Sequence, residues 1–126
     1  MRLLLDTAAL IYAAESPDRL SKRASTALRN RDNILEVSAV SLTEIAIKAS
    51  ARKLGFSEET VRRVLKELEI RVLAYTSEHA FRLFALPLHH RDPFDRQIIA
   101  QALSENIAIV TPDREFGLYK GLSIMW

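Results

Sequence analysis

Residues 3–10, LLLDTAAL, open the chain with an apolar run that ends at Asp6 and passes directly into a segment rich in Ala and Leu. A short apolar run followed at once by a helical pattern is typical of a buried parallel strand that leads into a helix. Four further runs are interpreted as buried strands, at residues 34–38, 70–74, 107–111 and 122–126. Strands and helices in alternation predict an α/β fold, with a parallel sheet covered by helices on both faces.

Helical patterns fill the intervals between these runs, and several begin with residues that commonly cap helices. The helix expected over residues 41–52 opens with S-L-T-E, which predicts a capping box formed by Ser41 and Glu44. The helix expected over residues 93–105 follows Asp92 and has proline at its first position. The other helices are expected over residues 7–14, 21–29, 57–68 and 77–86.

The length of 126 residues suits one compact domain over residues 1–126. The formal net charge of +2 is compatible with nucleic-acid binding but does not indicate it. The chain has no cysteine, which excludes disulfides, thiol nucleophiles and cysteine-bound zinc. Its apolar runs are far shorter than the roughly 20 residues of a membrane span, so we expect a soluble, cytoplasmic protein with no membrane partner.

Four acidic residues stand just after an apolar run or one turn into the helix that follows it. They are Asp6, Glu44, Asp95 and Asp113. The carboxyl ends of parallel strands gather at one edge of a sheet, where ligands bind, so these side chains could approach one another. Clustered carboxylates need a cation, and Mg²⁺ or Mn²⁺ prefers carboxylate oxygen and water as ligands. The pattern therefore predicts a carboxylate metal site.

Each acid alone also fits a purely structural role. Asp6 and Asp113 could cap the helical turns that follow them. Asp95 could complement the dipole of a helix that is capped by Asp92. Glu44 fits the capping box described above. Spacing alone cannot prove that the four side chains converge, so both interpretations stay open at this level.

The four segments resemble those of PIN-domain ribonucleases of the VapC toxin type, and the resemblance covers essentially the whole chain. The similar stretches are LLLDTAALIYA (residues 3–13), VSAVSLTEIAIKASARKL (37–54), HHRDPFDRQIIAQAL (89–103) and IAIVTPDREFGLY (107–119). The resemblance implies a PIN-like three-layer α/β/α fold with a central parallel sheet of about five strands. One departure is Ala8, where many relatives carry His; it leaves the acidic set intact.

By this resemblance, the protein is a Mg²⁺- or Mn²⁺-dependent endoribonuclease toxin that hydrolyses RNA, forms a homodimer and is neutralised by a cognate antitoxin. The resemblance places catalysis and metal binding on Asp6, Glu44, Asp95 and Asp113, and it lets the Thr111 hydroxyl point toward the site. Basic residues near these acids are candidate contacts for RNA phosphates. They are Lys48, Arg52, Lys53, Arg96 and Arg114.

Side chains on the first predicted helix, Leu10, Ile11 and Tyr12, are expected to belong mostly to the core rather than to an antitoxin groove. Lys48 also follows Glu44 by four residues, the spacing of an ion pair on a helix.

Three other functions remain possible. The chain could be a catalytically inactive PIN-fold interaction module whose acids serve as caps. A metal-independent ribonuclease would use a histidine pair; His79, His89 and His90 are available, but the adjacent two are expected to be exposed in a loop. A phospho-acceptor signalling domain would need adjacent acids after the first strand and a lysine after the last, and the sequence has neither.

Overall fold

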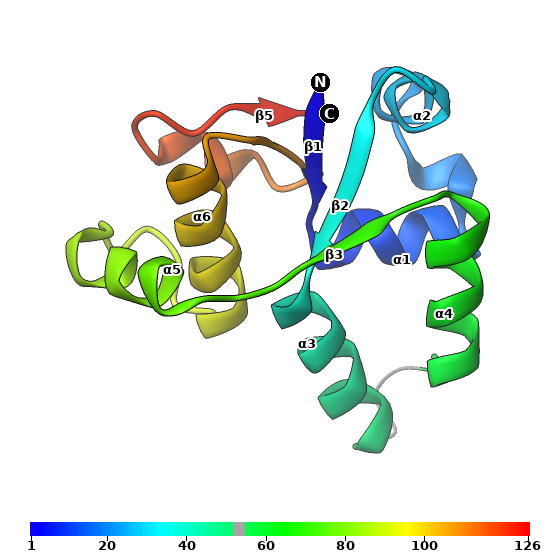
Figure 1. Cartoon of the computed structure of the whole chain (residues 1–126), viewed down its shortest axis with the longest axis horizontal. Helices are drawn as coiled ribbons and strands as arrows, with labels where there is room; N and C mark the ends of the chain where they lie inside the picture. The colour runs from blue at the N-terminus through cyan, green and yellow to red at the C-terminus, as the bar shows by residue number, and fades with distance from the viewer. Residues whose placement is uncertain (52–54) are drawn as a thin grey trace.

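The computed structural model describes residues 1–51 and 55–126, and within them a five-stranded parallel sheet lies at the centre (Figure 1). Its strands are β1 (Arg2–Leu5), β2 (Ile34–Ser38), β3 (Arg71–Leu73), β4 (Ala108–Val110) and β5 (Ile124–Met125). Their spatial order is β3-β2-β1-β4-β5, and every neighbouring pair is parallel. Each strand lies within or overlaps a predicted apolar run, which confirms the predicted α/β fold with a parallel sheet.

The central strand β1 explains why the first apolar run is uninterrupted. Leu3 and Leu5 are fully buried on one face of the sheet, and Leu4 is fully buried on the other. A strand that is covered on both faces must be apolar at successive positions rather than at alternate ones. The apolar run therefore ends at Asp6, just beyond the carboxyl end of β1.

Helices cover both faces. Helices α1 (Thr7–Glu15), α2 (Lys22–Arg29) and α4 (Glu58–Glu67) supply the core on the Leu3 face, whereas α6 (Pro93–Glu105) packs on the Leu4 face with α5 (Ser77–Arg82) against it. Short 3₁₀ turns are η1 (Pro17–Arg19), η2 (Leu83–Ala85) and η3 (Arg114–Leu118). In the described parts of the chain, every helix is too short or too polar to cross a membrane.

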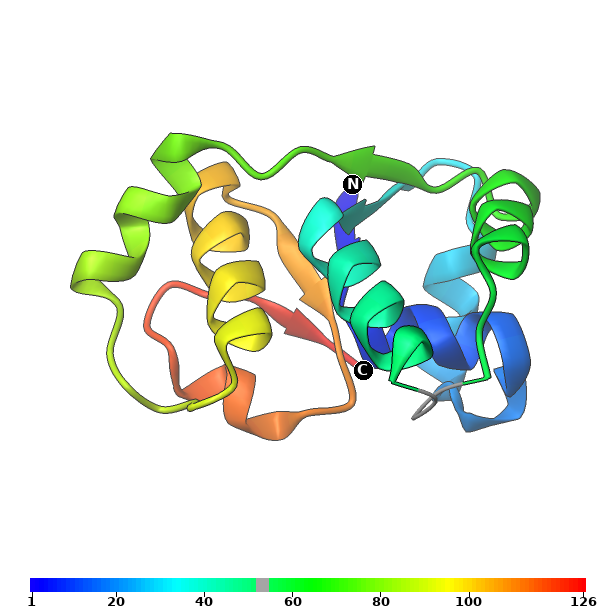
Figure 2. The same ribbon diagram turned by 90° about the horizontal axis from the view of Figure 1, so that it is seen from below.

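Helix α3 (Ala39–Ser50) continues from the carboxyl end of β2 and lies between α1 and α6 (Figure 2). Val40 packs in the core on the α6 side of the sheet, and Ile45 packs in the core on the α1 side. Helix α3 therefore contacts both cores at the carboxyl ends of the strands.

The prediction that Ser41 caps this helix is wrong. The N-cap is Ser38, whose Oγ accepts a hydrogen bond from the backbone N–H of Val40 at 3.0 Å. Strand β2 runs into α3 without a loop, so the helix begins two residues earlier than predicted and Ser41 lies buried inside its first turn. The predicted end at Arg52 lies outside the described residues.

The helix predicted over residues 77–86 is shorter than expected, because α5 ends at Arg82 and continues as the 3₁₀ turn η2.

Candidate metal and catalytic site

The direction in which strands are added to the sheet reverses between β1 and β4. From β1 the chain builds outward to β2 and β3 on one side, and it returns to β4 and β5 on the other. Ligands of open α/β sheets bind at such a reversal of strand order. Asp6 directly follows β1, and Thr111 directly follows β4. The backbone N–H of Asp6 donates to Val110 O at 3.0 Å, which holds the two strand ends together.

Asp6 is buried, with 5% of its surface exposed. Its Oδ1 accepts from the backbone N–H of Ala9 at 2.8 Å, so the expected cap of α1 is present. Its Oδ2 accepts from Thr111 Oγ1 at 2.5 Å. Thr111 Oγ1 in turn accepts from the backbone N–H of Asp113 at 3.0 Å. Thr111 therefore links the two aspartates through its hydroxyl.

Glu44 is also buried and lies on the second turn of α3, facing the start of α1. Its Oε1 lies 2.7 Å from Thr7 Oγ1, and Thr7 Oγ1 lies 2.9 Å from Ser41 Oγ. A carboxylate only accepts, so the single Thr7 proton is donated to Glu44 and Ser41 donates to Thr7. Lys48 Nζ donates to Glu44 Oε2 at 2.6 Å, the expected pair along the helix. These bonds replace the predicted capping box.

Asp95 lies half-buried in the first turn of α6. Asp92 is the N-cap of this helix, as predicted, and its Oδ1 accepts from the backbone N–H of Phe94 at 2.8 Å. The pKa of Asp95 is raised to about 6, chiefly by burial and then by the charges of Asp92 and Glu44, and His90 partly offsets these effects.

Burial likewise raises the pKa of Asp6 to about 7, although hydrogen bonds from Thr111 and Ala9 favour its ionised form. The charges of Asp95 and Asp113 contribute to this raised value. Asp95 is thus within electrostatic reach of Glu44, Asp6 and Asp113. Among the described residues, however, no three of the four predicted acids have ligand atoms within 4.8 Å of one another. A divalent cation bound between them would offset the cost of keeping Asp6 and Asp95 ionised.

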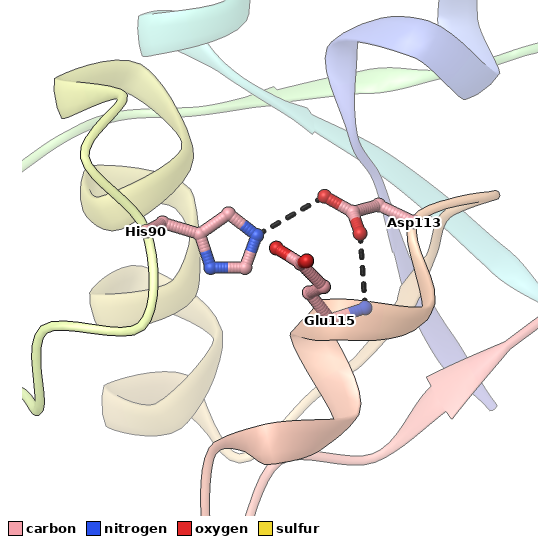
Figure 3. Close-up of side chains that lie close together, drawn as sticks. All are labelled: His90, Asp113 and Glu115. Carbon is pink, nitrogen blue, oxygen red and sulfur yellow. Dashed lines mark hydrogen bonds and ion pairs between the residues drawn. The ribbon is translucent and has the colours of Figure 1, made fainter.

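A tighter group lies beside these acids and includes residues that sequence reasoning misplaced or missed. Ligand atoms of His90, Asp113 and Glu115 all lie within 4.8 Å of one another, the only such trio of potential metal ligands within residues 1–51 and 55–126 (Figure 3). His90 Nε2 is 3.0 Å from Asp113 Oδ2. Asp113 Oδ1 accepts from the backbone N–H of Glu115 at 2.9 Å, the expected cap of the turn.

The expectation that His90 is exposed is wrong, because only 7% of its surface is accessible. The hydroxyl of Tyr119 lies 3.0 Å from its Nδ1 and accepts from its backbone N–H at 2.9 Å. Its ring also packs edge-on against Phe116. His89 is exposed, as expected. Glu115 was not predicted; its only signal in the sequence is its position two residues after Asp113.

The predicted phosphate contacts differ in what their side chains touch. Lys48 is paired with Glu44, and Arg114 is exposed. Arg96 donates to the backbone carbonyls of Pro87 and Leu86 at 2.9 and 3.3 Å, so it supports the loop before α6. Arg52 and Lys53 lie outside the described residues.

Two other groups of predicted residues lie away from the acids. His79 is buried beside Glu105, ten residues along α6 from Asp95, which is about 15 Å at 1.5 Å per residue. On α1, Leu10 is buried as expected, and Ile11 packs against the core. Tyr12 is half-buried, with Arg19 stacked on its ring.

The chain is similar to known proteins in sequence. A family model described as "PIN domain" matches residues 3–122. Ribonuclease VapC22 from Mycobacterium tuberculosis is 32% identical over 114 residues, which cover 89% of this chain and 87% of that protein.

Solved structures share the fold. VapBC2 from Rickettsia felis, bound to a DNA fragment from its promoter, superposes with a TM-score of 0.76 at 18% identity and covers 99% of this chain and 98% of the matched one. DNA-bound VapBC from Salmonella typhimurium gives 0.72 at 20% identity and covers 99% and 97%.

Proposed function

The chain belongs to the PIN-domain family, and from that premise we propose that it is a metal-dependent endoribonuclease that acts as a toxin. The observation that carries the proposal is the group of acids at the carboxyl ends of β1 and β4. There the buried Asp6 accepts a hydrogen bond from Thr111 and lies within electrostatic reach of Asp95 and Asp113. Similarity to a named ribonuclease over most of both chains supports RNA as the substrate.

We assign Mg²⁺ or Mn²⁺ to the carboxylates of Asp6, Glu44, Asp95 and Asp113. A cation held there would supply Lewis-acid chemistry, activating water and offsetting charge on the scissile phosphate. Hydrolysis forms a bond from the water oxygen to phosphorus and breaks the bond from phosphorus to the 3′ oxygen. The products are 5′-phosphate and 3′-hydroxyl ends.

The protein's own groups pre-organise this site. Thr111 fixes Oδ2 of Asp6 through its hydroxyl, and Ala9 fixes Oδ1 through its backbone N–H. Thr7 and Lys48 each hold one oxygen of Glu44. Carboxylates that are held in this way lose little freedom when they bind a ligand, which is the physical advantage of a pre-formed site.

Phosphate contacts remain assigned to Thr111, Lys48, Arg96 and Arg114. Arg114 is the freest of the three cations, because its side chain is exposed and directly follows Asp113. Lys48 would contact phosphate while it remains paired with Glu44. Arg96 would have to break its hydrogen bond to the carbonyl of Pro87 to reach phosphate. Replacing a cation that contacts phosphate should reduce the salt dependence of RNA binding by about one unit of log–log slope.

A cognate antitoxin is proposed as the partner, because the similar solved structures are VapBC assemblies and a toxin–antitoxin complex from Klebsiella pneumoniae is also among them. An apolar groove of about 510 Å³ lies between α3 and α4, next to the helix that carries Glu44. Its floor includes Ile45, Ala49 and Val61. A bound antitoxin segment would reach the acidic residues from this groove. We also propose a homodimer and a cytoplasmic location.

The test compares RNA cleavage by the wild type and by Asp95→Asn, with Mn²⁺ or with chelator, on mixed cellular RNA. Asp18→Asn is the matched control, since it makes the same change at an exposed acid on η1. Loss of even an outer partner of a metal ligand costs about 10–100-fold. Asp95→Asn should therefore reduce cleavage by more than about 100-fold, and Asp18→Asn should not.

Thermal melting with Mn²⁺ separates the alternatives. A ligand that binds only the folded state raises its stability, by about 2.7 kcal/mol at 100 times the Kd. A melting shift without cleavage of any RNA would favour the inactive interaction module. Cleavage that survives chelation would refute the metal-dependent mechanism.

A further inference from the structure

The trio of His90, Asp113 and Glu115 brings a nitrogen ligand next to the proposed carboxylate site (Figure 3). His90 comes from the loop before α6, whereas Asp113 and Glu115 come from the turn after β4. These segments are distant in the chain, so their meeting reflects the fold rather than local sequence. The proposed hydrolysis uses Asp113 but gives no role to His90 or Glu115.

The spacing of the trio suits a metal ion. Two neighbouring ligands at right angles around an ion, each about 2.1 Å from it, lie about 3 Å apart. His90 Nε2 and Asp113 Oδ2 are separated by 3.0 Å. An ion could therefore replace the proton that they share with little movement of either side chain.

The surroundings of His90 match those of a metal-binding histidine. Such residues donate their second ring N–H to an oxygen, which fixes the ring and its tautomer. Here Tyr119 Oη lies 3.0 Å from Nδ1, and its two lone pairs can accept both the ring N–H and the His90 backbone N–H. With Nδ1 as the donor to Tyr119, displacement of the proton shared with Asp113 leaves the Nε2 lone pair free to bind an ion. Phe116 and Tyr119 pack on the ring and prevent it from turning away.

We propose that His90, Asp113 and Glu115 form a second divalent-metal site, selective for transition metals such as Mn²⁺, that shares Asp113 with the carboxylate group. Imidazole suits transition metals, whereas Mg²⁺ takes oxygen ligands almost exclusively. Glu115 is exposed, so water or a phosphate oxygen can complete the coordination from the solvent side. The inference rests on the proposed function for the role of Asp113, and it makes the centre a two-metal site.

The experiment is Mn²⁺ titration by calorimetry, combined with pulsed EPR on the Mn²⁺-loaded protein. Coordination by His90 should give two Mn²⁺ per chain and the hyperfine coupling of a directly bound imidazole nitrogen. His90→Gln should remove that coupling. Glu115→Gln should weaken the second site by more than about tenfold, the least that loss of an outer partner commonly costs.

Glu115 is exposed, so its variant folds even if His90→Gln does not. Glu59→Gln, at an exposed residue in the first turn of α4, is the matched control and should leave both sites unchanged. One Mn²⁺ per chain without nitrogen coupling would overturn the second site and leave the carboxylate site standing. No bound Mn²⁺ would overturn both this inference and the metal-dependent function.

Discussion

Replacing Asp6 with Asn should stabilise the metal-free protein while it removes a proposed metal ligand. The Asp6 side chain is buried, and its pKa is raised to about 7 from 3.8, chiefly by that burial. Above pH 7 the folded protein must therefore hold an ionised carboxylate in an environment that disfavours the charge. Asn keeps the shape, and Asn is as good an N-cap as Asp for the backbone N–H of Ala9.

The size of the effect follows from the shift. Each pKa unit corresponds to about 1.4 kcal/mol, so a shift from 3.8 to about 7 is a penalty of roughly 4 kcal/mol at pH 8. Asn would present an amide N–H₂ to Thr111, whose hydroxyl must turn and lose its acceptor, at about 1 kcal/mol. The net gain is roughly 3 kcal/mol, or about 10 °C in Tm for a domain of this size.

The gain must depend on pH. Between pH 3.8 and about 7 the folded state holds more protons on Asp6 than the unfolded state does, so stability falls as pH rises through this window. Asp95, whose pKa is raised to about 6, adds to the same trend. Below pH 4 the carboxyl is protonated in both states, and the advantage of the Asp6→Asn variant should vanish. Wild type should therefore lose more stability than the variant between pH 5 and pH 8.

The assay is urea unfolding in chelator at pH 5 and pH 8, with Asp18→Asn as the exposed control. Adding saturating Mn²⁺ should then stabilise wild type more than Asp6→Asn, which retains only the proposed site at His90, Asp113 and Glu115. If Asp6→Asn destabilises the chelated protein at pH 8, or if its effect does not vary with pH, Asp6 is a structural cap and the argument from its buried charge fails.

Three further substitutions test a helix cap, a backbone conformation and a loop contact of the fold. Ser38→Ala should lower the free energy of unfolding by about 1 kcal/mol in urea, because it removes the N-cap of α3; an unchanged midpoint would mean that the cap contributes nothing. Glu69→Gly should raise the free energy of unfolding by about 0.5 kcal/mol, because Glu69 has a φ of 53° that suits glycine; a lower free energy of unfolding in the same assay would contradict this. Arg96→Gln should speed amide exchange at Leu86 and Leu88, because it removes the hydrogen bonds to the carbonyls of Leu86 and Pro87, and it should reduce the salt slope of RNA binding by about one; an unchanged slope would remove Arg96 from the phosphate contacts.

The centre of the sheet was predictable because β1, β2 and β4 are largely buried. Uninterrupted apolar runs such as Leu3–Leu5 are typical of strands covered on both faces, and their alternation with helices along the sequence predicts parallel pairing. Helix α6 was predicted to the residue, since Asp92 and Pro93 mark its start without ambiguity. Predictions of this kind succeed where one local signal has no competitor.

The start of α3 was predicted wrongly because two local signals compete. Ser38 and Ser41 both offer a hydroxyl, and the pattern S-L-T-E favours Ser41. The end of β2 decides between them, because Val37 pairs with Leu5 and the strand continues to Ser38. That pairing is a long-range property that a local pattern does not contain.

The burial of His90 could not be predicted from the local sequence either. Two adjacent histidines in a polar loop look exposed, and the partner that buries one of them, Tyr119, is 29 residues away. Glu115 acquires significance only through the same meeting of segments. Sequence reasoning thus singled out four acids, each from its own strand end or helix, and did not anticipate that His90 and Glu115 would lie beside Asp113.

The bond between Thr111 and Asp6 spans 105 residues, almost the whole chain. Closing so long a loop is entropically costly, and contacts of this kind form late in folding. A ribosome releases Asp6 long before Thr111, so no nascent fragment that lacks β4 can form this bond. Any chemistry that depends on the bonded pair therefore cannot begin before β4 has been made.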